Sequence, residues 1–159
     1  MIELRLIDTS DPLYGQECAL REEVLLRPVG YDVASFARAY STEDRFEHAI
    51  AVLEHPSGPR VVGCALLLPG YPDAQTGKVM QVAVDAQRRG ESIGRRLMTF
   101  LEQRGFGELG LTTLFCHAQL PAVPFYERLG WTIEGERFEE AGIPHYRMAM
   151  RIQESGPAR

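Results

Sequence analysis

One short segment, Gln87–Arg96, gathers the residues best suited to binding an anion. Four arginines, Arg88, Arg89, Arg95 and Arg96, fall within nine positions of a chain whose net charge is −5. The segment follows an apolar run and opens a helical pattern, so it places free backbone N–H groups of a helix start beside the basic cluster. Such a helix start can bind phosphate oxygens. The spacing therefore predicts a local anion site.

Other phosphate-binding patterns are absent from this segment. It contains neither GxxxxGK[ST] nor GxGxxG, so a nucleotide-binding domain would lack its phosphate lysine and a dinucleotide site is disfavoured. Small residues at Gly90, Ser92 and Gly94 would let a ligand approach the backbone closely. Glycines are also common in plain strand-to-helix turns, and charged helix starts are often only solvated. The anion site and this structural interpretation both stay open for the segment taken alone.

Hydrophobic periodicity locates the elements that must position the segment. Helical spacing of apolar residues predicts helices at Pro12–Leu26, Tyr31–Tyr40, Gly90–Arg104 and Ala122–Leu129. Apolar runs and alternation predict strands at Ile2–Ile7, Ala49–Leu53, Arg60–Leu68, Lys78–Val84, Thr112–Ala118, Trp131–Phe138 and Pro144–Ile152. The fourth and fifth strands should be parallel, joined by a right-handed helical crossover, and the other strands mostly antiparallel. This order predicts a mixed α/β fold.

Length and composition limit the class of protein. The 159 residues predict one domain, at 1–152, followed by a flexible tail at 153–159. The negative net charge argues against a nucleic-acid partner. No apolar stretch approaches the roughly 20 residues of a membrane helix, and the N-terminal residues have no signal-peptide core. A cytoplasmic location without a membrane partner is therefore expected.

Three cysteines, Cys18, Cys64 and Cys116, are widely spaced along the chain. An odd, scattered set without a CxxC pair argues against both a disulfide framework and a zinc site. We therefore expect reduced cysteines and no metal.

Two motifs resemble the GNAT acetyltransferase superfamily. Residues 89–94 are similar to its Q/R-x-x-G-x-G/A pattern, with Arg89 first, Gly94 last and Ser92 where the middle glycine is usual. One helix and one strand downstream, Val123–Trp131 resembles the F-Y-x-x-L-G-F signature. Two motifs at the expected separation are more specific than either alone. The resemblance covers roughly residues 60–152.

A narrower resemblance is to the ElaA-like branch of these proteins. It rests on Glu139–Met148, on Ala118 and Gln119 after the fifth strand, and on Leu20–Val24 in the first helix. The stretch Leu25–Tyr40 departs from the usual ElaA-like sequence. The acceptor side of the site is therefore expected to differ from that branch.

The resemblance implies a seven-stranded, mostly antiparallel GNAT-like sheet with helices on both faces. The parallel fourth and fifth strands would form the cleft for acetyl-CoA, with the pantetheine pairing like an extra strand. A backbone N–H near Val82 could then polarise the thioester carbonyl. The cofactor-binding residues implied by the motifs are Val82, Ala83, Val84, Arg89, Gly90, Glu91, Ser92, Ile93, Gly94, Arg95 and Gln119.

Tyr126 of the second motif is the implied general acid that protonates the leaving CoA thiolate. The alternative is an interior tyrosine that anchors its helix. A ping-pong nucleophile at Cys116 is disfavoured, since its apolar strand should keep the thiol protonated.

The general base is less determined. Gln81 cannot serve, although some relatives carry a glutamate on this strand. His145, His117 and a water chain remain candidates, because histidine titrates near neutrality. Arg21, with Glu22, could line the acceptor cleft or be exposed helix charges.

The implied function is direct acetyl transfer from acetyl-CoA to a primary amine of a small molecule or a lysine side chain. Amino sugars, polyamines, amino acids and protein lysines are candidate acceptors. The alternative is a non-catalytic acyl-CoA-binding sensor module. Members of the superfamily are often dimers, so a homodimer stays open.

Overall fold

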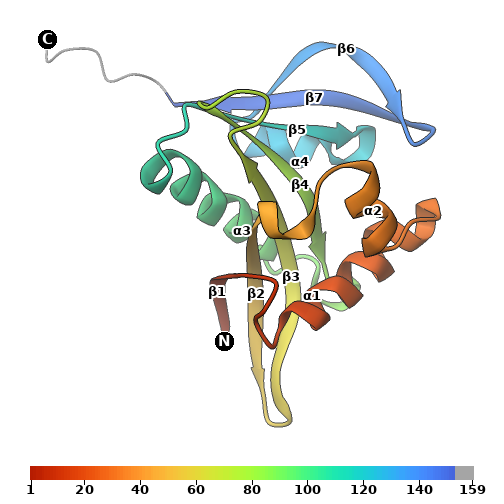
Figure 1. Ribbon diagram of the computed structural model, residues 1–159, viewed down its shortest axis with the longest axis vertical. Helices are drawn as coiled ribbons and strands as arrows, with labels where there is room; N and C mark the ends of the chain where they lie inside the picture. Colours follow the sequence, from red (N-terminus) through yellow and green to blue (C-terminus); the bar gives the residue numbers. More distant parts are fainter. Residues whose placement is uncertain (153–159) are drawn as a thin grey trace, which may run out of the picture.

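The computed structural model describes residues 1–152, and its centre is one seven-stranded sheet (Figure 1). The strands lie in the order β1-β2-β3-β4-β5-β7-β6. Their bounds are β1 Ile2–Ile7, β2 Glu47–His55, β3 Gly58–Pro69, β4 Thr76–Val84, β5 Thr113–Gln119, β6 Thr132–Glu140 and β7 Ile143–Arg151. All neighbouring strands pair antiparallel except β4 and β5, which are parallel. The predicted fold class is confirmed.

Within residues 1–152, four α-helices cover the two faces of the sheet, with α1 and α2 on one side and α3 and α4 on the other (Figure 1). Their bounds are α1 Tyr14–Arg21, α2 Val33–Ala39, α3 Ile93–Glu102 and α4 Val123–Arg128. Helix α1 continues as a π-helix at Glu22–Leu26 and a 3-10 turn at Arg27–Val29, and α3 continues as a π-helix at Gln103–Glu108. Further 3-10 turns lie at Glu43–Arg45, Ala86–Arg88 and Leu120–Ala122. None of the helices among residues 1–152 is long and apolar enough to cross a membrane.

The side chains of strand β3 are buried against helices on both faces of the sheet. Successive side chains of a strand point to opposite faces. Ala65 and Leu67 pack with the buried residues of α3, whereas Cys64 packs with α1 and Leu66 with α2. These four side chains have no exposed surface. The continuous apolar run in the sequence is therefore the signature of a central strand.

The parallel pairing of β4 with β5 is short. Residues 76–78 pair with 113–115, and no ladder pair between these strands follows within residues 1–152. Beyond this point β4 carries an irregularity: Gln81 has a φ of +54°, and the register with β3 shifts between Cys64 and Leu66. A non-glycine residue at positive φ inside a strand is unusual and marks a bulge. The bulge re-aims the backbone of β4 at the place where the two strands separate.

Several predicted boundaries moved by two or three residues. The second strand is four residues longer than predicted, because Glu47, His48, Glu54 and His55 also pair in the ladder. The first helix begins at Tyr14, and the Asp11 carboxylate accepts a hydrogen bond from the Leu13 N–H at 2.8 Å. The predicted tail, 153–159, lies outside the described residues.

Candidate active site

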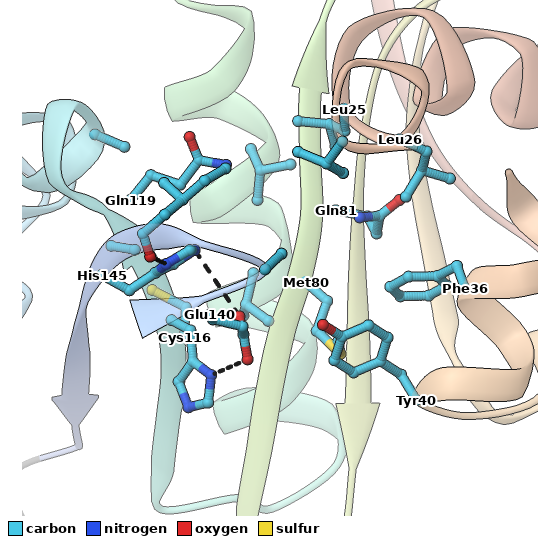
Figure 2. A pocket seen from close by; sticks show the side chains of 18 of the residues that line it. Leu25, Leu26, Phe36, Tyr40, Met80, Gln81, Cys116, Gln119, Glu140 and His145 are labelled. Atoms are coloured by element: carbon cyan, nitrogen blue, oxygen red, sulfur yellow. Dashed lines mark hydrogen bonds and ion pairs between the residues drawn. The ribbon is translucent and has the colours of Figure 1, made fainter. Parts of the chain in front are cut away.

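A cavity of about 510 Å³ opens where β4 and β5 separate (Figure 2). Its walls come from β4, from β5 and the start of α4, from the β6–β7 turn, and from the segment that joins α1 to α2. The cavity thus reaches both faces of the sheet through the gap between the parallel strands. Val82 and Gln119, both predicted cofactor contacts, line it on opposite strands.

The predicted anion turn lies at one end of this cavity, but only part of its basic cluster faces it. Arg89 is exposed and lines the cavity. Arg88 forms an ion pair with Glu91 at 3.5 Å, and the Arg96 guanidinium donates to the Ile2 carbonyl oxygen at 3.2 Å. Arg95 does not line the cavity either, so Arg89 is the member of the cluster whose charge faces the site.

The start of α3 has the geometry of an open helix N-terminus. Ser92 is the N-cap residue, with φ +63°, and its side chain makes no capping hydrogen bond. The first N–H groups of α3 have no intrahelical partner. Ile93 anchors the turn, because its side chain is buried in the core. Ile93 and the equally buried Ala83 can therefore offer a ligand only backbone groups.

Gly94 has a packing reason to be glycine. A Cβ at this position would lie 3.3 Å from the Phe125 ring, which is tighter than ordinary contact. Helix α3 and the start of α4 thus approach each other across Gly94. The last glycine of the first motif and the phenylalanine of the second motif are spatial partners.

Ser92 gives a testable prediction about the turn. The left-handed conformation costs a non-glycine residue about 1–2 kcal/mol, partly offset by the extra chain entropy of an unfolded glycine. Ser92→Gly is therefore expected to raise the free energy of unfolding by up to about 1 kcal/mol, measured by denaturant titration. CoA affinity, measured by calorimetry, should be equal or tighter.

Ala141→Gly is the matched control for Ser92. Ala141 has φ +52° in the β6–β7 turn, and it lines the cavity from a different element than the anion turn. It should show a similar gain in stability with unchanged CoA affinity. A loss of CoA affinity in Ser92→Gly alone would mean that the serine hydroxyl itself contacts the cofactor.

Tyr126 and Cys116 lie side by side in the middle of the cavity wall. Both side chains are almost fully buried, at 7% and 2% exposure. Burial, together with the neighbouring Cys116, holds the pKa of Tyr126 well above its usual range. Burial also raises the pKa of Cys116 to about 12. The phenol and the thiol therefore both stay protonated at neutral pH, so Tyr126 can donate a proton and Cys116 is no thiolate nucleophile.

The far end of the cavity holds two histidines around one carboxylate (Figure 2). His117 Nδ1 lies 3.1 Å from Glu140 Oε1, and His145 Nε2 lies 3.8 Å from Glu140 Oε2. The hydrogen bond from His117 is the main cause that lowers the pKa of Glu140. His145 Nδ1 lies 2.7 Å from the Ile143 carbonyl oxygen, which can only accept, so Nδ1 carries the hydrogen. The Nε2 of a neutral His145 is then a free acceptor.

Glu140 and Lys78 also line the cavity, although neither is among the site residues predicted from the sequence. The two-residue turn between β6 and β7 folds Glu140 back beside His145. Lys78 lines the cavity with 8% exposure, and its ammonium lies 5.8 Å from the centre of the Tyr40 ring. The hairpin turn was a usable signal for Glu140. No sequence signal marked Lys78, because the strand that contains it is mostly apolar.

Both expectations for Arg21, as a residue of the acceptor cleft or as an exposed helix charge, are wrong. It neither lines the cavity nor reaches solvent, and its guanidinium is fully buried between Glu17 and Glu43. Its Nε donates to Gln81 Oε1 at 3.2 Å. Glu22 also turns away, toward the Val33 N–H. Arg21 is buried because the carboxylates of Glu17 and Glu43, which lie inside the protein, require a cation beside them.

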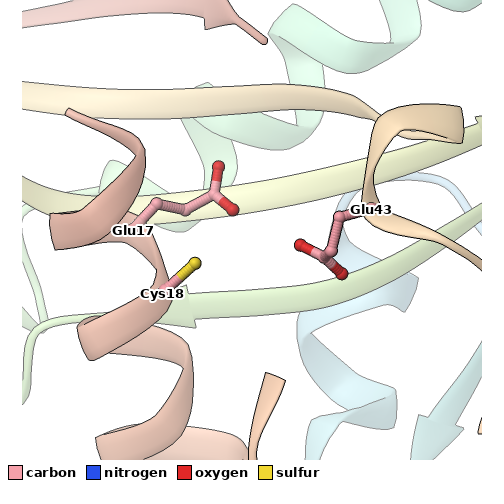
Figure 3. A group of neighbouring side chains, drawn as sticks. All are labelled: Glu17, Cys18 and Glu43. Carbon is pink, nitrogen blue, oxygen red and sulfur yellow. The ribbon is translucent and has the colours of Figure 1, made fainter. Parts of the chain in front are cut away.

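Glu17, Cys18 and Glu43 form the group that most resembles a metal site among residues 1–152 (Figure 3). Their ligand atoms lie within 4.8 Å of one another. Arg21 already binds both carboxylates, and burial raises the pKa of the Cys18 thiol. A cation would have to displace the guanidinium, so the donor set does not suit a metal.

Comparison with known proteins identifies the family. Residues 31–152 match the family model described as an acetyltransferase (GNAT) domain. YjcF, an uncharacterized N-acetyltransferase of Bacillus subtilis (strain 168), is 29% identical over 132 residues, which cover 81% of this chain and 86% of YjcF. The uncharacterized protein YyaT of the same organism is 34% identical over 77 residues, 48% of this chain, and the match spans about half of its length (51%).

Solved structures share the fold. Escherichia coli ElaA has a TM-score of 0.76 and 23% identity, with 94% of this chain and 99% of ElaA covered. An aminoglycoside 6'-N-acetyltransferase complexed with coenzyme A has a TM-score of 0.75 and 19% identity, with 94% and 96% covered. The resemblance read from residues 89–94 and Val123–Trp131 is confirmed, and the protein is an acyltransferase. The chain belongs to the GNAT acetyltransferase family.

Proposed function

We propose that this protein transfers an acetyl group directly from acetyl-CoA to a primary amine. One observation carries the proposal: the cavity passes through the sheet where β4 and β5 stop pairing, with the Val82 backbone on one side and Tyr126 on the other. The unpaired edge of β4 can bind an extended pantetheine as an added strand. The helix start at Ser92 and the Arg89 side chain suit the pyrophosphate. A related structure was solved with coenzyme A, which supports this choice of cofactor.

The reaction needs three contributions from the chain. A backbone N–H near Val82 stabilises the charge that develops on the thioester oxygen. The amine nitrogen attacks the carbonyl carbon, and the C–N bond forms as the C–S bond breaks. The CoA thiolate takes the Tyr126 proton, and the surplus proton of the amine passes to His145, His117 or a water chain. Of the other predicted cofactor contacts, Gln119 lines the cavity. The contacts at Gly90, Glu91, Arg95 and Val84 stay predictions, as do the cytoplasmic location and the homodimer.

The test measures cofactor binding and turnover separately. CoA binding is followed by calorimetry, and thiol release is followed with acetyl-CoA and a panel of primary amines. Binding together with amine-dependent thiol release supports the proposal. Tight binding without release on any amine favours the sensor module. Absence of CoA binding would overturn both.

A direct mechanism makes a further prediction about Cys116. Cys116→Ala is expected to keep a rate of thiol release of the same order, because the buried thiol is protonated and forms no bond to the acetyl group. Intact mass spectrometry of the wild type with acetyl-CoA should show no acetylated protein. Cys64→Ala, a buried cysteine that does not line the cavity, is the control for lost packing. An acetyl group trapped on Cys116 would contradict direct transfer.

A further inference from the structure

The far end of the cavity, which holds Glu140 and is called the acceptor end below, has two unlike walls. One wall is apolar and comes from Leu25 and Leu26 of the π-helix, Phe36 and Tyr40 of the α2 region, and Met80 of β4. The other is polar and holds His117, Glu140 and His145. Figure 2 shows Leu25, Leu26, Phe36 and Tyr40 across the cavity from Glu140 and His145. A ligand that spans this space meets hydrocarbon on one side and hydrogen-bonding groups on the other.

The charges at this end allow for one ammonium group. Glu140 is the only carboxylate among the described residues that line the cavity. The buried Lys78 ammonium lines the same space, and its charge acts on Glu140. A second or third ammonium on an acceptor would therefore meet no carboxylate and one cation. Polyamines and aminoglycosides carry several ammonium groups, so these walls argue against them.

The geometry of Glu140 leaves a place for that single ammonium. Its Oε1 accepts from His117, whereas its Oε2 lies 3.8 Å from His145 Nε2, which is too far for a direct hydrogen bond. Two acceptor atoms at this separation can both receive hydrogens from one nitrogen between them. The fixed Nδ1–H of His145 leaves Nε2 able to take a proton from it.

We propose that the acceptor is a compact primary monoamine with an apolar or aromatic body, which packs on the apolar wall described above while its ammonium binds between Glu140 and His145. This inference rests on the proposed acetyl transfer. The ammonium gives one proton to His145 Nε2, and the resulting neutral amine attacks the thioester. His145 then passes its proton to solvent. Glu140 orients the amine and keeps its own charge throughout.

The experiment compares acceptors at fixed acetyl-CoA by the rate of thiol release. The panel is 2-phenylethylamine, isoamylamine, phenylalanine, spermidine, kanamycin and a lysine peptide. The kcat/KM of the two apolar monoamines should exceed that of each other amine by about tenfold or more. Phenylalanine tests whether a carboxylate beside the amine is tolerated next to Glu140.

Variants test the polar wall and the apolar wall separately. Circular dichroism and the melting temperature show whether each variant is folded. Glu140→Gln should raise the KM for 2-phenylethylamine about 10- to 100-fold, because it removes a charged hydrogen-bond acceptor, with CoA affinity unchanged. Glu139→Gln, an exposed carboxylate on the same hairpin, is the matched control. Leu25→Glu adds a second carboxylate to the half-buried apolar wall, so it should shift the preference from 2-phenylethylamine toward spermidine.

Failure of the proposed acceptor class can be distinguished from failure of the proposed acetyl transfer. If CoA binds and spermidine, kanamycin, phenylalanine or the lysine peptide is turned over faster than the two apolar monoamines, the proposed acceptor class is wrong. Acetyl transfer itself would still be supported. An unchanged KM in Glu140→Gln overturns the ammonium site. No CoA binding, or no thiol release with any amine, overturns acetyl transfer and the inference with it.

Discussion

Tyr126→Phe is expected to lower the kcat of thiol release by about 10²- to 10³-fold while CoA affinity stays nearly unchanged. The substitution removes only the hydroxyl, and the ring keeps its place against Phe125 and Trp131, whose centres lie 5.1 and 5.6 Å away. Without the hydroxyl the thiolate must leave unprotonated or find water. Because burial holds the pKa of Tyr126 above its usual range, the phenol stays protonated as pH rises through neutrality, so the loss should be similar across that range.

Tyr146→Phe is the matched control for Tyr126. Tyr146 packs against the same core cluster from β7, but it does not line the cavity. Its variant should keep the wild-type kcat and melting temperature. If Tyr126→Phe retained most of the wild-type kcat, Tyr126 would be an anchor of helix α4 and the proton would come from elsewhere.

Arg21→Met is expected to lower the free energy of unfolding by about 3–5 kcal/mol, because the buried cluster of Glu17, Glu43 and His48 is left with one carboxylate uncompensated. Arg21 Nη1 lies 3.0 Å from Glu17 Oε2, and Nη2 lies 3.0 Å from Glu43 Oε2. His48 donates its Nε2–H to the Glu43 carbonyl oxygen, and its Nδ1 lies 2.9 Å from Glu17. Burial opposes the charged form of His48, but the hydrogen bonds to Glu17 and Glu43 and their negative charges together outweigh it and raise the pKa of His48. One guanidinium and one imidazolium thus balance two carboxylates.

Denaturant titration of Arg21→Met against Arg5→Met checks this loss. Arg5 pairs with Glu3 at 3.1 Å on the surface, where such pairs contribute about 0–1 kcal/mol. A loss in Arg21→Met no larger than in Arg5→Met would contradict the role of the buried cluster. The variant also removes the hydrogen bond to Gln81, which lines the cavity next to Val82. A folded Arg21→Met protein should therefore show a lower kcat than Arg5→Met.

The sequence predicted the parts of the fold that depend on local pattern. The central strand and helix α3 were found because apolar spacing reports which faces are buried. The two motifs located the anion turn and Tyr126, and Gly94 against Phe125 shows that these segments are one unit in space. Placement of the two motifs needed no knowledge of distant partners.

The misplaced and missed residues depend on distant partners. Arg21 resembles an exposed helix residue until Glu43, 22 positions away, is brought beside it. Glu140 becomes a site residue only when the hairpin sets it between two histidines. The positive φ of Gln81 has no sequence signal, since glutamine rarely adopts it and the surrounding structure imposes it.

The short parallel pairing of β4 with β5 also affects the stability of the sheet. These strands share three residue pairs, whereas every other neighbouring pair of strands shares at least six. The backbone amides at the open ends of β4 and β5 should therefore exchange with deuterated solvent sooner than those of β3. A pantetheine bound in the gap, as proposed above, would act as an added strand and join the two halves. Its binding energy then adds to folding stability, by about 2.7 kcal/mol at a hundred times its Kd.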